Sequence, residues 1–183
     1  MDSDLRGLFD DVWSSDRARQ NAAFSALMQA TEELVPWADD VWDEALANLT
    51  HRDNHNRAIA AQLLCNLAKS DPQQRMLTDL PALLEVTKDD RFVTARHCLQ
   101  ALWKVGAAGD EQRRLLLEGM ETRFDTCLEE KNWSLIRFDI LQGMRNLYDQ
   151  TGSDDVKRLA LELISRETDP KYQKKYAGAW RGA

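Results

Sequence analysis

The sequence predicts an all-α fold, and three observations carry that prediction. Apolar residues recur three and four positions apart through most of the 183 residues, which is the spacing that places side chains on one face of a helix. Only eight glycines and four prolines interrupt the chain, while the abundant Ala, Leu, Arg, Glu and Gln all favour helix. The apolar stripes also come in pairs that repeat about every 40 residues, so we expect stacked helical hairpins and no strand.

The first two pairs of stripes occupy residues 1–35 and 36–70. Asp16 is a suitable N-cap for the second helix of the first pair. Pro36 fits the first turn of the next helix, because its missing amide donor costs little there. The polar residues 50–54 then separate that helix from its partner. Each pair therefore reads as one helical hairpin.

Two further pairs fill residues 71–108 and 109–150. Asp71, Pro72 and Gln74 form a helix-start signature for the third pair, with Asp71 as the cap. Pro81 either kinks the first helix of this pair or marks its true start, and we expect the start, because proline is tolerated in a first turn and not in a helix interior. Lys131 and Asn132 form the polar turn of the fourth pair. The four pairs together predict one domain built as an α-solenoid of about four hairpins.

Residues 151–183 are expected to cap this stack. Ser153 is a suitable N-cap for a helix that follows it. Tyr172, Tyr176 and Trp180 recur every four residues, and this aromatic stripe would cover the apolar end of the last hairpin. The complete prediction is a single domain over residues 1–183 that ends in a C-terminal capping helix.

The third hairpin resembles a known repeat. Its first helix contains Leu-Pro, its turn contains two aspartates, and Arg96 follows Asp90 by six residues with apolar positions beyond it. These features resemble the HEAT motif, and a period near 40 residues is typical of the HEAT/armadillo class. Arg57 after Asp53 is a weaker copy of the pattern in the second hairpin.

The resemblance implies that the second helices line the concave face of a curved stack and that an Asp/Arg ladder joins neighbouring hairpins. The residues expected in this ladder are Asp53, Arg57, Asp90, Arg96, Asn132 and Arg137. The first hairpin lacks the arginine of the motif, and Asn132 replaces the turn aspartate of the fourth. We therefore expect the ladder to be broken at these two hairpins.

A HEAT-like motif identifies an architecture and leaves the function open. Because no residue constellation in the chain forms a recognisable active site, we expect a non-catalytic scaffold that holds a segment of another protein on its concave face. The candidate contacts are outward positions of the second helices, and buried aromatic anchors often dominate such interfaces. They are Gln62, Asn66, Gln100, Trp103, Lys104, Trp133, Asp139, Gln142 and Arg145. Each also fits ordinary solvated surface.

The charge of the chain is unevenly distributed. Its net charge is −7, and residues 1–50 hold eleven acids against three bases. Clustered acids attract a basic segment of a partner protein and repel nucleic acid, so we expect the first and not the second. The acids concerned are Asp2, Asp4, Asp10, Asp11, Asp39, Asp40, Asp43 and Glu44.

Cofactor and metal chemistry has little support in the sequence. The chain contains no Walker loop, dinucleotide fingerprint or HExxH motif. His51 and His55 have the spacing of a metal-binding pair, but a third ligand is missing. Cys98 follows His97, yet no oxyanion element accompanies this thiol. We expect no cofactor and no metal.

One enzyme class remains as an alternative. Some HEAT-like proteins that resemble this chain are alkylpurine DNA glycosylases, and the resemblance implies a catalytic aspartate beside aromatic residues on the concave face. Asp139, with Trp133 and Phe138 close in sequence, is the candidate for that role. The acidic first fifty residues oppose the phosphate binding that such an enzyme requires.

The location of the protein is predicted from what the sequence lacks. The acidic N-terminus contains no apolar run of signal-peptide length, and no stretch approaches the ~20 apolar residues of a membrane helix. The three cysteines are odd in number and far apart, which favours reduced thiols. A cytoplasmic protein is expected.

Overall fold

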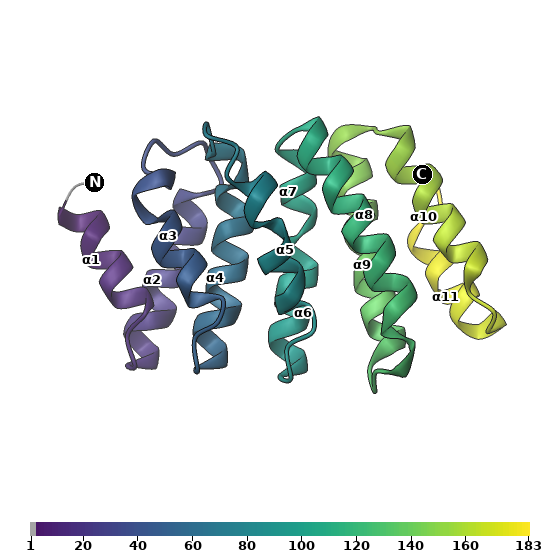
Figure 1. The fold of residues 1–183 in the computed structure, drawn as a ribbon, viewed down its shortest axis with the longest axis horizontal. Helices are drawn as coiled ribbons and strands as arrows, with labels where there is room; N and C mark the ends of the chain where they lie inside the picture. The colour runs from purple at the N-terminus through teal and green to yellow at the C-terminus, as the bar shows by residue number, and fades with distance from the viewer. Residues whose placement is uncertain (1–2) are drawn as a thin grey trace.

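The computed structural model describes residues 3–183, and every regular element in that range is a helix, which confirms the predicted all-α solenoid. The helices form five hairpins (Figure 1). The first helices are α1 (Ser3–Val12), α3 (Ala38–Asn48), α5 (Met76–Val86), α8 (Asp110–Thr126) and α10 (Asp154–Arg166). The second helices are α2 (Arg17–Ala30), α4 (Asn54–Leu67), α6 (Phe92–Ala101) with α7 (Trp103–Ala107), α9 (Trp133–Thr151) and α11 (Pro170–Ala179). Short 3-10 turns, Ala68–Ser70 and Cys127–Glu129, follow α4 and α8.

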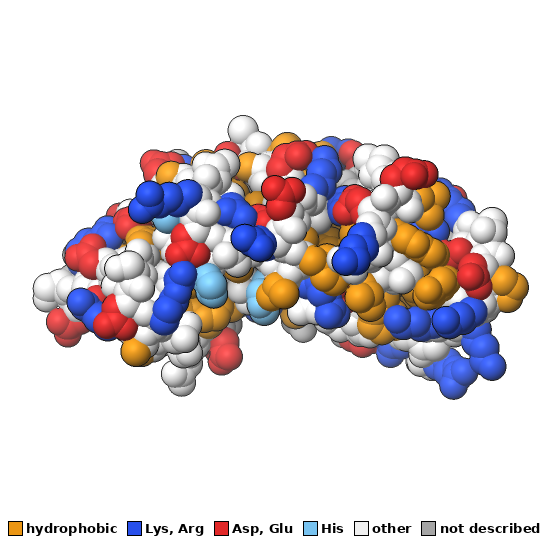
Figure 2. All heavy atoms as spheres, turned by 90° about the horizontal axis from the view of Figure 1, so that it is seen from below, with side chains coloured by type: hydrophobic (Ala, Val, Ile, Leu, Met, Phe, Trp, Pro, Cys, Tyr) orange, Lys and Arg blue, Asp and Glu red, His pale blue; other side chains and the backbone are white. Residues whose placement is uncertain are grey.

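The hairpins stack side by side, so that their helices form two layers. The first helices lie in front in Figure 1, where α8 contacts both α5 and α10. The second helices lie behind them, with α4 packed on α6 and α9 packed on both α6 and α11. Viewed from the turns, the molecule is an arch that is hollowed along the second helices (Figure 2). The second helices therefore line the concave face.

Local signals in the sequence explain where several helices begin. The carboxylate of Asp16 accepts hydrogen bonds from the amides of Ala18 and Arg19, and Asp53 caps α4 in the same way through the amide of His55. Asp169 caps α11, with Pro170 in its first turn. Ser153 occupies the N-cap position of α10, but its hydroxyl makes no capping bond.

Two expected features of the third hairpin are wrong. Helix α5 begins at Met76 and contains Pro81, because the carboxylate of Asp71 accepts a hydrogen bond from the Met76 amide at 2.8 Å and starts the helix earlier. Pro81 is exposed and forms part of a surface groove. The second helix of this hairpin is also divided in two at Leu102.

The C-terminal cap, residues 151–183, is a hairpin of α10 and α11. Tyr176 and Trp180 are buried against α9, where the Tyr176 hydroxyl donates to the Ser134 carbonyl at 3.0 Å and the Trp180 indole N–H donates to the Leu141 carbonyl at 3.1 Å. These two bonds satisfy the polar atoms that burial of the rings would otherwise leave unpaired. The core thus continues from the first hairpin to the last.

Candidate binding site on the concave face

A pocket of about 350 Å³ opens on the concave side, where the C-terminal ends of four second helices come together. Its lining comes from α4, α7 and α9 and from the residues that follow α2 and α4. The lining residues are Thr31, Glu32, Cys65, Asn66, Lys69, Trp103, Lys104, Ala107 and Gln150. Three residues that the sequence placed on a binding face, Asn66, Trp103 and Lys104, are among them.

Two lysines of this pocket are held by neutral groups. Lys104 donates to the side-chain oxygen of Asn66 and lies 5.9 Å from the centre of the Trp103 ring, while Lys69 donates to the Glu32 carbonyl. Burial lowers the pKa of Lys104, because an ammonium loses hydration in the pocket. Within residues 3–183, neither lysine forms an ion pair with a carboxylate.

Asn66 is an internal bridge and not an outward contact. Only 4% of the residue is exposed, and its amide donates to the Thr31 hydroxyl at 3.0 Å while its oxygen accepts from Lys104. The side chain therefore joins α4 to the end of α2 and to α7. Its expected contact with a partner is wrong for this reason.

Three glutamines lie at similar positions of α4, α6 and α9. Gln62 and Gln142 are half-buried and bond within their own helices, to the Ala58 carbonyl at 3.0 Å and to Asn146 at 3.2 Å. Gln100 is exposed, and its amide is 3.5 Å from Asp139. The three remain accessible on the concave side, and their role in binding stays a prediction.

Asp139 is enclosed, so neither of its expected roles is supported. Its side chain is 3% exposed. Both carboxylate oxygens accept from Arg96, from Nε at 2.7 Å and from Nη2 at 3.0 Å. A carboxylate that is 3% exposed and already paired with a guanidinium has almost no surface left for a partner or a flipped base. The glycosylase alternative therefore loses its catalytic candidate.

Trp133 and Arg145 connect α9 to the C-terminal hairpin. Trp133 is half-buried and packs edge-on against Tyr172, with the ring centres 4.9 Å apart. Arg145 pairs with Asp149 at 2.8 Å and donates to the carbonyls of Ala179 and Arg181. Both residues fasten the end of the stack, and any contact with a partner remains a prediction.

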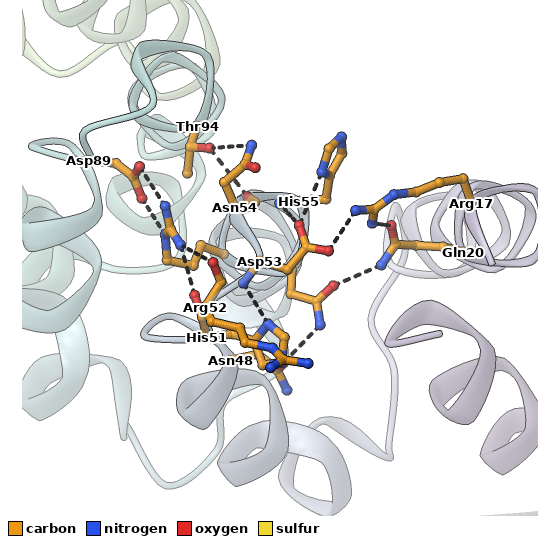
Figure 3. Close-up of polar contacts among 12 residues, drawn as sticks. Arg17, Gln20, Asn48, His51, Arg52, Asp53, Asn54, His55, Asp89 and Thr94 are labelled. Carbon is orange, nitrogen blue, oxygen red and sulfur yellow. Dashed lines mark hydrogen bonds and ion pairs between the residues drawn. The ribbon is translucent and has the colours of Figure 1, made fainter. Parts of the chain in front are cut away.

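A ladder of ion pairs runs through all four boundaries between the hairpins. At each boundary an arginine in the first turns of a second helix reaches an acid of the next hairpin. The pairs are Arg17–Asp53 at 2.6 Å, Arg57–Asp89 at 2.5 Å, Arg96–Asp139 at 2.7 Å and Arg137–Glu167 at 2.9 Å. Figure 3 shows Asp53 and Asp89 at the first two of these boundaries.

The ladder differs from the expected one in its acids and in its length. Asp89 and not Asp90 accepts from Arg57, and no bond is found for Asn132 as a ladder residue. Asp139, which lies within α9, and Glu167, in the turn between α10 and α11, supply the acids of the last two rungs. Arg17 supplies the rung expected to be missing from the first hairpin, because its long side chain reaches from the first residue of α2. An arginine within the first five residues of every second helix up to α9 was the signal that could have found it.

Two acids of the ladder, Asp53 and Asp89, have lowered pKa values. Burial of Asp53 favours the neutral acid, but hydrogen bonds from the His55 amide and from Arg17 outweigh it and lower the pKa to about 2. Burial of Asp89 also favours the neutral acid, but the hydrogen bonds from Arg57 and from the Arg91 amide, together with the positive charges of both arginines, outweigh it and lower the pKa. Both carboxylates are therefore charged throughout the neutral range.

The histidines of the second hairpin belong to the same polar network (Figure 3). Nδ1 of His51 accepts from the Asp53 amide at 3.0 Å, and Nδ1 of His55 lies 3.2 Å from the Asp53 carboxylate. In the described part of the chain, no three His, Cys, Asp or Glu side chains gather as metal ligands would. The two histidines support the turn between α3 and α4.

The cysteines are buried and free. Burial raises the pKa of Cys65 to about 12, and it also raises the pKa values of Cys98 and Cys127. The Cys98 thiol donates to the Leu83 carbonyl at 3.3 Å. A protonated, buried thiol is a weak nucleophile, so the pairing of His97 with Cys98 in the sequence has no reactive counterpart in the structure.

The two layers carry opposite charge. The first helices hold seventeen carboxylates and seven bases, a net charge of −10. The second helices hold ten bases and two carboxylates, a net charge of +8. Those two carboxylates, Asp139 and Asp149, are both paired with arginine. Among the helices, the acidic excess is therefore in the convex layer and the basic excess in the concave layer, where turn acids such as Asp53, Asp89 and Glu167 neutralise part of it.

A larger groove, of about 630 Å³, lies between the first helices α5 and α8. Its floor is apolar, with Leu77, Leu84 and Leu115 among the lining residues. The charged groups around it are paired with one another, as in Lys88–Glu85 and Arg123–Glu130. The groove therefore shows no charge preference for an occupant.

Among the residues that the structure describes, no helix combines the length and the apolar character that a membrane span requires.

No family model and no curated protein matches the sequence of this chain. Solved structures do match its fold. One is the complex of CpcE and CpcF of phycocyanin lyase from Nostoc sp. PCC7120, with a TM-score of 0.62 and 15% identity over 96% of this chain and 97% of that one. Two engineered proteins match with TM-scores of 0.56 and 0.55 at 16% and 18% identity, over 97% and 98% of this chain and 78% and 80% of theirs. The chain therefore has an all-helical, HEAT-like repeat solenoid fold.

Proposed function

We propose that this protein is a non-catalytic scaffold that binds a segment of another protein on its concave face. The observation that carries the proposal is the concave pocket, in which Trp103, Lys104 and Lys69 are held in place at the meeting point of four second helices. A pocket that spans several repeats suits a segment that crosses them, because each repeat then contributes a few contacts.

The comparisons support this proposal at the level of the fold. The phycocyanin lyase structure is a complex of two proteins, and its chain has the same solenoid architecture as this one. The side chains that the sequence suggested as catalytic candidates also favour binding over catalysis. Asp139 is bound by Arg96, and the thiol of Cys98 is buried and protonated. Binding is thus the simplest use of the concave side chains.

The expectation of a basic partner segment concerns the opposite side of the molecule. The acids that suggested it lie on α1 and α3 in the convex layer, except Asp2, which lies outside the described residues. Several of them are paired within the chain, as in Glu44–Arg6 and Asp43–Arg75. A basic segment at the convex layer stays a prediction, and so does a cytoplasmic location, which the three free cysteines would suit.

Affinity capture from the source organism tests the scaffold proposal, with matched variants as bait. Gln100→Glu/Gln142→Glu changes two concave side chains and keeps their shape. Gln73→Glu/Gln74→Glu makes the same change in the exposed loop before α5. We expect the wild type and the loop variant to enrich one protein that the concave variant loses. Equal enrichment by both variants, or none by the wild type, contradicts the proposal.

A further inference from the structure

The basic concave layer indicates the chemistry of the segment that it binds. Most arginines of this layer are already neutralised, since Arg57, Arg96 and Arg137 belong to the ladder and Arg145 pairs with Asp149. The positive charge without a carboxylate partner in residues 3–183 therefore comes from lysines. A surface whose fixed charges lack counter-ions attracts an oppositely charged partner and speeds its association.

These lysines form two clusters, which we call the pocket cluster and the α11 cluster. The pocket cluster is Lys69 and Lys104 beside Trp103. The α11 cluster is Lys171, Lys174 and Lys175, where Lys175 lies 4.7 Å from the centre of the Phe138 ring. Lys and Arg side chains gather over this C-terminal hairpin in the lower right of Figure 2. Each cluster combines ammonium groups with an aromatic ring.

Lys104 gives the clearest sign of a missing anion. Its ammonium is partly desolvated and contacts the neutral oxygen of Asn66 and the Trp103 ring, while the Glu32 carboxylate attracts it from beyond ion-pair distance. Burying a charge without a counter-ion is unfavourable, so a carboxylate that enters the pocket would recover part of that free energy. Lys69 retains N–H donors beyond its single bond to the Glu32 carbonyl, because an ammonium has three.

We propose that the concave face binds an acidic peptide segment of the partner protein, with carboxylates paired to Lys69 and Lys104 beside Trp103 and further acidic residues at the α11 cluster. This inference rests on the proposed function and specifies its partner. The glutamines Gln100 and Gln142 lie on the helices between the two clusters. The segment therefore has acidic residues at its two ends and a less charged middle.

A peptide fits this surface better than nucleic acid. Phosphates follow one another at a fixed short spacing and need a continuous row of bases. Here the central arginines are occupied by ladder acids, so the lysine clusters are separated and do not form such a row. A pocket of about 350 Å³ also accepts a few side chains and not a duplex.

Fluorescence anisotropy at about 50 mM salt tests the inference, because screening is weak there. The labelled probes are a short peptide that alternates glutamate with leucine, the same peptide with lysine for glutamate, and a single-stranded DNA of equal charge. We expect the acidic peptide to bind, and its Kd to rise with salt. In Lys69→Gln/Lys104→Gln we expect the Kd to rise about tenfold, as the loss of two charge pairs implies.

Lys88→Gln/Arg158→Gln is the matched control, because it removes two positive charges outside the concave face and should leave the Kd within about twofold. A second variant, Lys171→Gln/Lys174→Gln/Lys175→Gln, keeps the test valid if the pocket variant misfolds. Its three side chains are exposed, so it should fold, and we expect it to weaken binding as well.

Each of the other outcomes overturns the acidic segment. Tighter binding of the DNA would indicate nucleic acid, and tighter binding of the lysine peptide would reverse the sign of the partner. Self-association at low salt that the pocket variant abolishes would identify a second copy, whose acidic convex layer fits the basic concave one. If no probe binds, but affinity capture still enriches a partner that the concave variant loses, the scaffold proposal is supported and the proposal of an acidic segment is refuted.

Discussion

Arg137 is the most enclosed arginine of the ladder. Its guanidinium is 2.9 Å from Glu167, donates to the Phe124 carbonyl at 3.0 Å and lies 4.1 Å from the centre of the Phe124 ring. Both partners of the ion pair are at most 6% exposed. Removal of one partner leaves the other charge buried and unpaired, which is far more costly than the loss of a solvated pair.

We therefore predict unequal costs along the ladder. Arg137→Ala should lower the free energy of unfolding by about 3 to 5 kcal/mol. Arg17→Ala should lower it by less than about 1 kcal/mol, because the Arg17 side chain is 44% exposed. Urea unfolding followed by circular dichroism measures both. Arg137→Met/Glu167→Leu should recover much of the loss, and equal losses for the two single variants would refute this account.

Asp53 gives a prediction for acid stability. Its pKa of about 2 in the folded protein is below the value of about 3.9 of an unfolded aspartate. A lowered pKa stabilises the fold above the unfolded value, and this contribution is lost as the pH falls through the folded value. Asp53→Asn keeps an N-cap acceptor and removes the charge.

The stability difference between wild type and Asp53→Asn should be largest near neutral pH and shrink between about pH 4 and about pH 2. Urea midpoints at a series of pH values measure this difference. A difference that stays constant down to pH 2 would show that the charge of Asp53 contributes nothing and that the two side chains differ only as caps.

At the scale of the helix, substitutions at two glycines distinguish the effect of core packing on stability from the effect of helix propensity. A Cβ at Gly106 would lie 2.8 Å from Leu147 and 3.0 Å from Leu116, and both leucines are fully buried. A Cβ at Gly119 would also meet a leucine, Leu84, but that side chain is half-buried and lines the groove between α5 and α8. Leu84 has space to move, and the two core leucines have none.

Gly106→Ala should therefore destabilise the protein by about 1 to 3 kcal/mol, as overpacking of a core does. Gly119→Ala should be neutral or should stabilise by up to about 1 kcal/mol, because alanine favours helix and the clash is relieved in the groove. Thermal unfolding of the two variants compares them directly. The opposite order would show that the groove side of α8 is the more rigid one.

The sequence predicted the helices well and their partners across repeats less well. Apolar spacing and the caps at Asp16 and Asp53 are local signals, so they could be read from the chain. Asp71 was recognised as a helix cap, but the start of α5 was still placed wrongly at Pro81, because the Asp71 carboxylate binds the Met76 amide five residues away, beyond the usual capping distance in sequence. The acid that meets Arg137 is thirty residues distant in the chain, and only the packing of α10 and α11 against α9 brings it there.

The candidate site shows the same division. The outward positions of Gln100 and Lys104 follow from helical spacing, but the enclosure of Asp139 depends on Arg96 of the neighbouring hairpin. For a related reason, the net charge of the chain did not predict the charge of the concave face. It sums over first helices that carry −10, second helices that carry +8 and connecting segments that carry the rest, and only the stacked structure separates them.

At the scale of the whole molecule, the two ends of the stack are attached differently. The first hairpin joins the second through the partly exposed Arg17–Asp53 pair and through the bond of Gln20 to Asn56 at 2.8 Å. The last hairpin supplies Glu167 to Arg137 and buries Tyr176 and Trp180 on α9. A repeat stack is stabilised by its nearest-neighbour interfaces, so unequal interfaces give unequal ends.

We predict that a chain lacking residues 153–183 loses cooperative unfolding, because α9 then exposes the apolar surface under Tyr176 and Trp180 and Arg137 stays buried without its carboxylate. A chain lacking residues 1–35 should keep a cooperative transition at a lower midpoint, because the acid that it leaves without a partner, Asp53, is accessible to water. Urea unfolding by circular dichroism and size-exclusion chromatography compare the two. The opposite result, an unfolded N-terminal deletion and a folded C-terminal one, would contradict this prediction. It would show that the first hairpin, and not the buried Arg137–Glu167 pair, contributes most to the stability of the stack.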